Sequence, residues 1–191
     1  HNIVLQMALK HVGLKPVIKS QGEPLAADEV NLQIMPPPDM PPALAAKKID
    51  AFIVAEPFNA AGEMLAKGKM LRFTGDMWRN HPCCVVCMNE NQVNANPEWT
   101  QKVMNAIVRA QDYAQKNKKE VAHMLSRNGK GYLPMKAPVV ERAMTQYDVT
   151  NYSQPPAIQH PEWGSGRIDF QPWPFRSATK LIVDQLKDTL V

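Results

Sequence analysis

The chain has 191 residues, which is enough for one large domain or two small ones. Apolar residues make up 45% and charged residues 21%, and no apolar run reaches the roughly 18 residues that a membrane-spanning helix needs. The net charge of +4 comes from scattered basic residues that form no stripe with aromatic residues, which argues against nucleic-acid binding. The 17 prolines occur without a glycine period or a low-complexity tract, which excludes collagen-like and disordered chains.

The first third of the chain predicts alternating helices and strands. Apolar residues recur at helical spacing over residues 2–12, and residues 30–34 alternate between apolar and polar as in a strand. Asp39 follows three prolines and stands where the N-cap of a short helix through residues 43–47 belongs. The apolar run over residues 49–55 predicts a strand that is buried on both faces.

A helix over residues 59–67 and a short strand over residues 71–74 continue this alternation, which favours an α/β fold with parallel strands. Sheets of this kind bind ligands outside the carboxyl ends of their strands. Those ends are predicted at residues 35–39, 56–59 and 75–81, and most of the unusual residues of the chain lie in these three loops.

The second half of the chain predicts mainly helices. A strand over residues 83–88 comes first, and the later elements are helices over residues 97–115, 118–126 and 138–147, a long loop over 150–174 with a short strand at 167–170, and a helix at 181–187. Because the chain opens without Met inside a predicted helix and closes inside another, we expect it to be part of a longer protein.

No motif of a common catalytic class is present. The sequence contains no H-E-x-x-H, G-x-S-x-G, G-x-G-x-x-G or P-loop segment, and no pair of histidines is spaced i, i+4. Hydrolase, kinase and dehydrogenase functions therefore have no support from the sequence.

Three cysteines cluster in the predicted strand, at Cys83, Cys84 and Cys87. On a strand, Cys83 and Cys87 share a face but lie about 13 Å apart, which is too far for one metal ion or one disulfide. We therefore expect all three to be small buried residues of a core strand. Iron binding, a redox role and a bridge between Cys83 and Cys84 are the alternatives.

Polar residues that follow two of the predicted strands are candidates for a binding site. Glu56 either caps the next helix or accepts a hydrogen bond from a ligand. In the segment Trp78-Arg79-Asn80-His81-Pro82, the Arg79 guanidinium can hold a carboxylate, sulfonate or nitrate through two parallel hydrogen bonds, and Trp78 can wall a small site. A surface turn with a solvated Arg79, in which His81 is only a turn residue, is the alternative.

Four segments occur in the order and spacing of one family. They are His1-Asn2-Ile3-Val4-Leu5, Met35-Pro36-Pro37-Pro38-Asp39-Met40, Ile49-Asp50-Ala51-Phe52 running into Glu56-Pro57-Phe58-Asn59, and Trp78-Arg79-Asn80-His81-Pro82. On these segments the sequence resembles the substrate-binding proteins of ABC importers for nitrate, bicarbonate, sulfonates and taurine. The nearest branch is the one that binds nitrate and bicarbonate.

The resemblance implies a two-lobed α/β fold of the periplasmic-binding-protein kind (type II), with the ligand in the cleft between the lobes. Residues 1–77 would then form lobe 2. Residues 78–191 would form the crossover and the C-terminal part of lobe 1, and the first part of lobe 1 would be missing.

The resemblance also implies a set of ligand-binding residues, namely His1, Glu56, Asn59, Trp78, Arg79 and His81. His1 matches a histidine that faces the anion in the nitrate branch, and Arg79 matches a basic position that meets the charge of the ligand. Because Arg79 stands where lysine is common, and Cys83-Cys84 where charged residues are common, a sulfonate or carboxylate remains open beside nitrate.

The implied function is transport without catalysis. The chain would capture a small anion and deliver it to an ABC permease in the membrane, as a monomer without a cofactor or metal, in the periplasm or anchored to a lipid outside the cell. The alternatives are a thiamine-pyrimidine precursor binding protein, an iron-dependent pyrimidine synthase-like enzyme, and the ligand-sensing domain of a regulator. Pyrimidine synthases of this kind carry a cysteine-rich segment, and residues 83–87 match it imperfectly.

Overall fold

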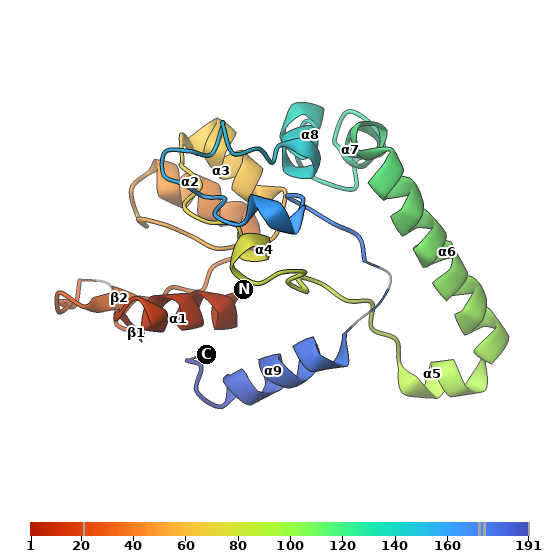
Figure 1. The fold of residues 1–191 in the computed structure, drawn as a ribbon, viewed down its shortest axis with the longest axis horizontal. Helices are drawn as coiled ribbons and strands as arrows, with labels where there is room; N and C mark the ends of the chain where they lie inside the picture. The colour runs from red at the N-terminus through yellow and green to blue at the C-terminus, as the bar shows by residue number, and fades with distance from the viewer. Residues whose placement is uncertain (21, 172, 174, 191) are drawn as a thin grey trace. The chain divides into compact units, whose positions relative to one another are not determined.

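The computed structural model describes residues 1–20, 22–171, 173 and 175–190 (Figure 1). It is a mixed α/β structure in which helices dominate. The chain divides into two compact units: unit 1 comprises His1–Lys69 and Phe175–Val191, and unit 2 comprises Met70–Pro174. In the part of the chain that the structure describes, no helix is both long and apolar enough to cross a membrane.

Unit 1 combines short helices with one pair of strands. Its elements are α1 (Asn2–His11), β1 (Lys15–Val17), β2 (Glu29–Asn31), the 3-10 helix η1 (Pro37–Asp39), α2 (Met40–Ala45), α3 (Phe58–Ala66) and α9 (Arg176–Leu186). The helices predicted over residues 2–12 and 59–67 are confirmed as α1 and α3. The predicted strand over residues 30–34 is shorter and begins earlier, as β2.

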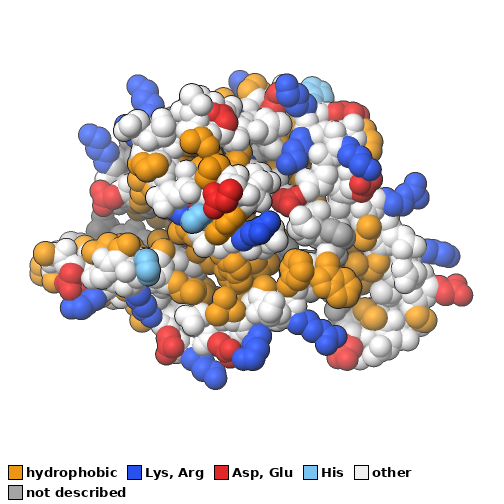
Figure 2. Space-filling model, in the orientation of Figure 1, with side chains coloured by type: hydrophobic (Ala, Val, Ile, Leu, Met, Phe, Trp, Pro, Cys, Tyr) orange, Lys and Arg blue, Asp and Glu red, His pale blue; other side chains and the backbone are white. Residues whose placement is uncertain are grey.

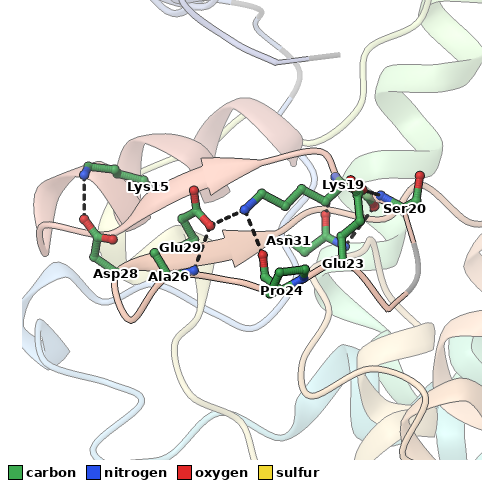
Figure 3. A network of polar contacts seen from close by, with 9 residues as sticks. All are labelled: Lys15, Lys19, Ser20, Glu23, Pro24, Ala26, Asp28, Glu29 and Asn31. Atoms are coloured by element: carbon green, nitrogen blue, oxygen red, sulfur yellow. Dashed lines mark hydrogen bonds and ion pairs between the residues drawn. The ribbon is translucent and has the colours of Figure 1, made fainter.

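The two strands pair in parallel, with Lys15 opposite Glu29, and a network of polar contacts fixes the loop between them (Figure 3). Lys19 Nζ lies 2.5 Å from Glu29 Oε2, which also accepts a hydrogen bond of 2.9 Å from the Ala26 backbone N–H. Lys15 pairs with Asp28 at 2.7 Å, and both side chains are largely exposed. Solvent screens exposed ion pairs of this kind, so the network fixes the loop conformation more than it stabilises the unit.

The C-terminal residues Asp188 and Leu190 contact α1, in part through a buried glutamine. Gln6 is 1% exposed, and its amide donates to the Leu190 carbonyl at 2.7 Å and accepts from the Leu190 N–H at 2.9 Å. Asn2 donates to the same carbonyl at 2.8 Å, and Lys10 donates to the Asp188 carbonyl at 2.7 Å. Buried amides are stable when their donors and acceptors are paired, which explains a polar residue on the packed face of α1.

The apolar run over residues 49–55 packs against α3 and forms no strand. The prediction of a buried strand at these residues is therefore wrong. Phe52 lies so close to Gly62 that a β-carbon on Gly62 would stand 2.7 Å from Phe52 Cζ. Val54 is buried at 7% exposure, as are Ala60 and Ala61 at 0% and 1%. An apolar run indicates that its side chains are buried. Those side chains can be buried by packing directly on a helix, without a neighbouring strand.

Asp39 stands at the N-cap position of α2, as predicted, but its side chain makes no capping hydrogen bond. The reason is local geometry, because the preceding 3-10 turn holds Asp39 at φ −86° and ψ −16°. A capping side chain reaches the helix N–H groups from an extended backbone instead.

Unit 2 is helical, with long connections. Its elements are α4 (Thr74–Met77), α5 (Glu90–Ala95), α6 (Pro97–Lys116), α7 (Lys118–Leu125), α8 (Ala137–Thr145) and the 3-10 helix η2 (Pro161–Trp163). The helices predicted over residues 97–115, 118–126 and 138–147 are confirmed as α6, α7 and α8. Pro97 occupies the first turn of α6, where its missing N–H leaves no hydrogen bond unmade.

Among the described residues, two apolar clusters stabilise unit 2. The first joins the end of α6 to α7 and α8, and its buried members are Ala114, Val121, Ala122, Val140 and Met144. The second lies beside α4, and its buried members are Phe73, Tyr152, Ala157 and Ile158.

The strands predicted over residues 71–74, 83–88 and 167–170 are wrong, because none of these segments pairs with a strand in the described residues. Their apolar side chains serve other purposes. Phe73 belongs to the second cluster, while Ile168 and Phe170 pack against the first. On the face that Figure 2 shows, Lys and Arg side chains are interspersed with Asp and Glu and gather in no single patch.

Candidate functional site

The predicted site residues fall into two groups. His1, Glu56 and Asn59 belong to unit 1, while Trp78, Arg79 and His81 belong to unit 2. Within unit 2 the structure brings all three together in one turn. Within unit 1 it brings Glu56 and Asn59 together at the start of α3, while His1 stands at the N-cap of α1.

The turn over residues 78–81 directly follows α4. The His81 N–H donates to the Trp78 carbonyl at 2.9 Å, and Asn80 has a φ of +59°. Asn tolerates this left-handed conformation better than most residues. The ring centroids of Trp78 and His81 lie 5.5 Å apart, so the two rings contact across the turn. Arg79 at the tip is exposed.

His81 is the titratable aromatic group of this turn. It is partly buried, and burial lowers the pKa of its imidazole below the usual 6.5. The imidazole is therefore neutral near pH 7, where one ring nitrogen donates a hydrogen bond and the other accepts one. The guanidinium of Arg79 supplies the positive charge of the turn.

A buried carboxylate anchors the turn. Asp76 in α4 is fully buried, and its two oxygens accept hydrogen bonds of 2.9 and 2.8 Å from the backbone N–H groups of Gln159 and His160. Arg72 completes the arrangement with an ion pair of 2.9 Å to Asp76. A buried charge is stable only when it is paired and hydrogen-bonded, and this carboxylate has both kinds of contact. Asp76 thereby fixes the helix from which the turn extends.

Aromatic residues pack beneath the same helix. The Phe73 ring lies 5.0 Å from that of Tyr147 and 4.9 Å from that of Tyr152. Arg167 lies over Phe73, with its guanidinium carbon 5.4 Å from the ring centroid, and donates to the Tyr152 hydroxyl at 2.6 Å. The structure thus uses Arg167 for packing, whereas Arg79 projects from the surface.

The sequence analysis missed Asp76 and Arg72. One signal was available, since Arg72 and Asp76 have the i, i+4 spacing at which opposite charges pair on a helix, although Arg72 itself precedes α4. It was weak because such pairs are usually exposed, and the partners that make this one buried lie more than 80 residues away along the chain.

At the start of α3, Glu56 and Asn59 bond to the backbone of their own unit. Glu56 Oε2 accepts a hydrogen bond of 3.1 Å from the Ala60 N–H, and Asn59 Nδ2 donates to the Val54 carbonyl at 2.6 Å. Pro57 occupies the N-cap position of α3, and Glu56, one residue before it, contacts the first turn of the helix through its bond to Ala60. His1 is half-buried, and its carbonyl accepts from the Leu5 N–H at 2.9 Å.

The three cysteines are exposed, so the prediction of buried core residues is wrong. The reason is that residues 83–88 form no strand, and the neighbouring Val85 and Val86 are 62% and 55% exposed. The sulfur atoms of Cys83 and Cys84 lie 3.5 Å apart. Among the described residues, no three His, Cys, Asp or Glu side chains are grouped as metal ligands.

The chain is similar to a known protein family and to several characterised proteins. A family model described as the NMT1-like family matches residues 1–126. The nitrate/nitrite binding protein NrtA of Nostoc sp. (strain PCC 7120) is 31% identical over 122 residues, which are 63% of this chain and 28% of that protein. The chain therefore spans just over a quarter of the length of this relative.

Two transport ATP-binding proteins of Synechocystis sp. (strain PCC 6803) also contain a similar stretch of 85 residues. The nitrate import ATP-binding protein NrtC is 34% identical, and the bicarbonate transport ATP-binding protein CmpC is 31% identical. Each match covers 44% of this chain and 13% of the relative. No solved structure matches the chain.

Proposed function

The chain belongs to the NMT1-like family, and we propose that it is the solute-binding component of an ABC importer that captures a small anion and delivers it to a membrane permease. The family match and the similarity to a nitrate/nitrite binding protein support this assignment. They also confirm the resemblance to the nitrate- and bicarbonate-binding branch that the sequence motifs predicted.

The observation that carries the anion assignment is the position of Arg79. It is exposed at the tip of a turn whose base is fixed by the fully buried Asp76. Among the described residues, Arg79 takes part in no ion pair, so its charge is not neutralised by a neighbouring carboxylate. A guanidinium in a fixed turn matches planar or tetrahedral oxyanions, and nitrate, bicarbonate and sulfonates are the classes we propose.

The two-lobed fold implied by the resemblance is part of the proposal. Residues 1–77 form one lobe and residues 78–191 belong to the other. The proposed ligand-binding residues are His1, Glu56 and Asn59 within residues 1–77, and Trp78, Arg79 and His81 within residues 78–191. The bonds from Glu56 and Asn59 to the backbone hold these two side chains in place and leave the charge recognition to Arg79.

The remaining parts of the proposal concern setting and mechanism. The protein acts as a monomer in the periplasm, or anchored to a lipid outside the cell, and performs no chemical step. Its relatives include proteins named for nitrate import and bicarbonate transport, which fits delivery to a permease driven by ATP.

The test is a thermal-shift and calorimetric screen of the chain against sodium nitrate, bicarbonate, taurine and ethanesulfonate, with sodium chloride as the ionic-strength control. A ligand that binds only the folded state stabilises it by about 2.7 kcal/mol at a hundredfold excess over its Kd. We expect one of these anions to raise the unfolding temperature. Because hydrogen bonds to charged groups contribute about 1.5–3 kcal/mol, Arg79→Ala should weaken its binding about tenfold or more.

Arg109→Ala is the matched control, because Arg109 is an exposed arginine of the same unit, on α6. It should leave the affinity unchanged, and Arg79→Lys should retain part of it. Equal binding by the wild type and Arg79→Ala would contradict the proposed site. A shift with an aminopyrimidine precursor of thiamine, and with none of the anions, would favour the pyrimidine-binding alternative.

A further inference from the structure

The cysteine segment is left unused by the proposed function. Cys83, Cys84 and Cys87 are all exposed thiols, and the segment that carries them belongs to no helix or strand. Exposed thiols are accessible to oxidants in solution, whereas buried ones are inert. The feature that sets two of them apart is distance, since the sulfur atoms of Cys83 and Cys84 lie 3.5 Å from each other.

We propose that Cys83 and Cys84 form a redox-active dithiol that closes reversibly to a disulfide between adjacent residues. A disulfide requires about 2.05 Å between the sulfur atoms, so closing the present 3.5 Å needs an approach of roughly 1.5 Å. No strand ladder holds the segment among the described residues, and the neighbouring Val85 and Val86 are exposed, so no regular backbone pairing has to break when the two sulfur atoms approach.

Cys87 is the competing partner, and the spacing argues against it. An extended chain separates residues 84 and 87 by about 10 Å and residues 83 and 87 by about 13 Å, whereas disulfides need α-carbons within about 7 Å. A bond to Cys87 would therefore require the segment to fold back on itself. Cys83 and Cys84 already have their sulfur atoms in contact.

The oxidant that we name is a small disulfide such as oxidised glutathione. One cysteine thiolate attacks a glutathione sulfur and releases the first glutathione thiolate, which leaves a mixed disulfide on the protein. The second cysteine thiolate then attacks the protein sulfur of that mixed disulfide, forms the Sγ–Sγ bond and releases the second glutathione. The protein loses two protons and two electrons, and two molecules of reduced glutathione carry them away.

The bond formed in this way is easy to reduce. The α-carbons of adjacent residues are about 3.8 Å apart, which is shorter than the roughly 4.4–6.8 Å found in most disulfides. Deviation from the usual geometry strains the bond, and strained, exposed disulfides have more oxidising potentials than structural ones. The pair therefore serves as a reversible modification site and not as a permanent crosslink.

The experiment is a redox titration followed by alkylation and mass spectrometry. The reduced chain is equilibrated with buffers of reduced and oxidised glutathione, and remaining thiols are trapped with N-ethylmaleimide. Trypsin releases all three cysteines in one peptide, residues 80–102, because cleavage sites flank it at Arg79 and Lys102. We expect oxidation to remove two of the three alkylation sites, with Cys87 still alkylated, and dithiothreitol to restore all three.

The variants make the assignment specific. Cys87→Ser should titrate like the wild type, whereas Cys83→Ser and Cys84→Ser should each lose the intramolecular disulfide. Circular dichroism checks that each variant is folded, which the exposure of the side chains favours. Retention of three alkylated thiols under oxidising buffer, a disulfide that includes Cys87, or oxidation only to dimers between chains would each overturn the proposal. These readouts involve no anion, so their failure would leave the proposed transport function untouched.

Discussion

The start of α3 and the turn over residues 78–81 are two segments that the sequence presents in the same way, as polar residues after an apolar run. The structure treats them differently. Glu56 and Asn59 bond to the backbone N–H and C=O groups around their own helix. Arg79 is exposed, and the bonds that fix its turn are made by Asp76 in the preceding helix. A turn that is anchored by another residue leaves the Arg79 guanidinium available for a ligand.

The largest expected effect comes from removing that anchor. Asp76→Ala leaves two backbone N–H groups and the Arg72 guanidinium without their buried partner. Breaking a buried ion pair from one side costs about 3–5 kcal/mol, so unit 2 should lose most of its stability. All four tryptophans lie in residues 78–173, within unit 2, so urea unfolding followed by tryptophan fluorescence measures this unit alone.

Asp112→Ala is the control for this prediction. Asp112 pairs with Lys116 at 2.8 Å on α6, but both side chains are more than 60% exposed. Exposed pairs contribute about 0.2–1 kcal/mol, so the midpoint should move little. An equal loss of unfolding free energy in the two variants would mean that the contacts of buried Asp76 stabilise unit 2 no more than those of an exposed aspartate.

The next effect concerns the conformation of the turn itself. Asn80 has a φ of +59°, and a β-branched residue in the left-handed region costs roughly 1–2 kcal/mol or more. Asn80→Val should therefore destabilise unit 2, whereas Asn80→Gly should be close to neutral, because glycine adopts this conformation readily. The measurement is again urea unfolding by tryptophan fluorescence. Similar stability of the two variants would show that the left-handed conformation is not required.

How much the sequence predicted differs between elements for a physical reason. The helices α1, α3, α6, α7 and α8 were predicted because their periodicity and end signals are local. The strands predicted over residues 49–55, 71–74, 83–88 and 167–170 do not form in the structure, because an apolar run reveals burial and leaves open whether the neighbour is a strand or a helix. Phe52 packs on Gly62 of α3, a contact that no periodicity encodes.

The candidate site shows the same division. Motif resemblance pointed to Trp78, Arg79 and His81, which the structure places in one turn. Asp76 and Arg72 were missed because their importance depends on backbone groups of Gln159 and His160. The burial of a carboxylate cannot be predicted from its local sequence, because the residues that bury it come from distant segments of the chain.

A smaller effect is expected at the start of α3, in unit 1. Glu56→Ala removes the acceptor for the Ala60 N–H and should cost about 1 kcal/mol, the typical contribution of a cap. Glu56→Gln keeps an oxygen acceptor and should lose less. Unit 1 contains no tryptophan, so far-UV circular dichroism during urea unfolding is the suitable readout. A loss of ligand affinity in Glu56→Gln without loss of stability would assign Glu56 to the ligand as well as to the helix.

The smallest effect is a pH dependence that separates the turn from the rest of unit 2. Burial lowers the pKa of His81 below the usual 6.5, so the unfolded state binds a proton more readily than the folded state. The stability associated with a neutral His81 is fully present above about pH 6.5 and is lost as the pH falls through the lowered folded-state pKa. His81→Gln cannot titrate, so its stability should fall less between pH 7 and pH 5 than that of the wild type, as measured by tryptophan fluorescence. Parallel pH profiles for the two proteins would mean that the His81 ring is as well solvated in the turn as in the unfolded chain.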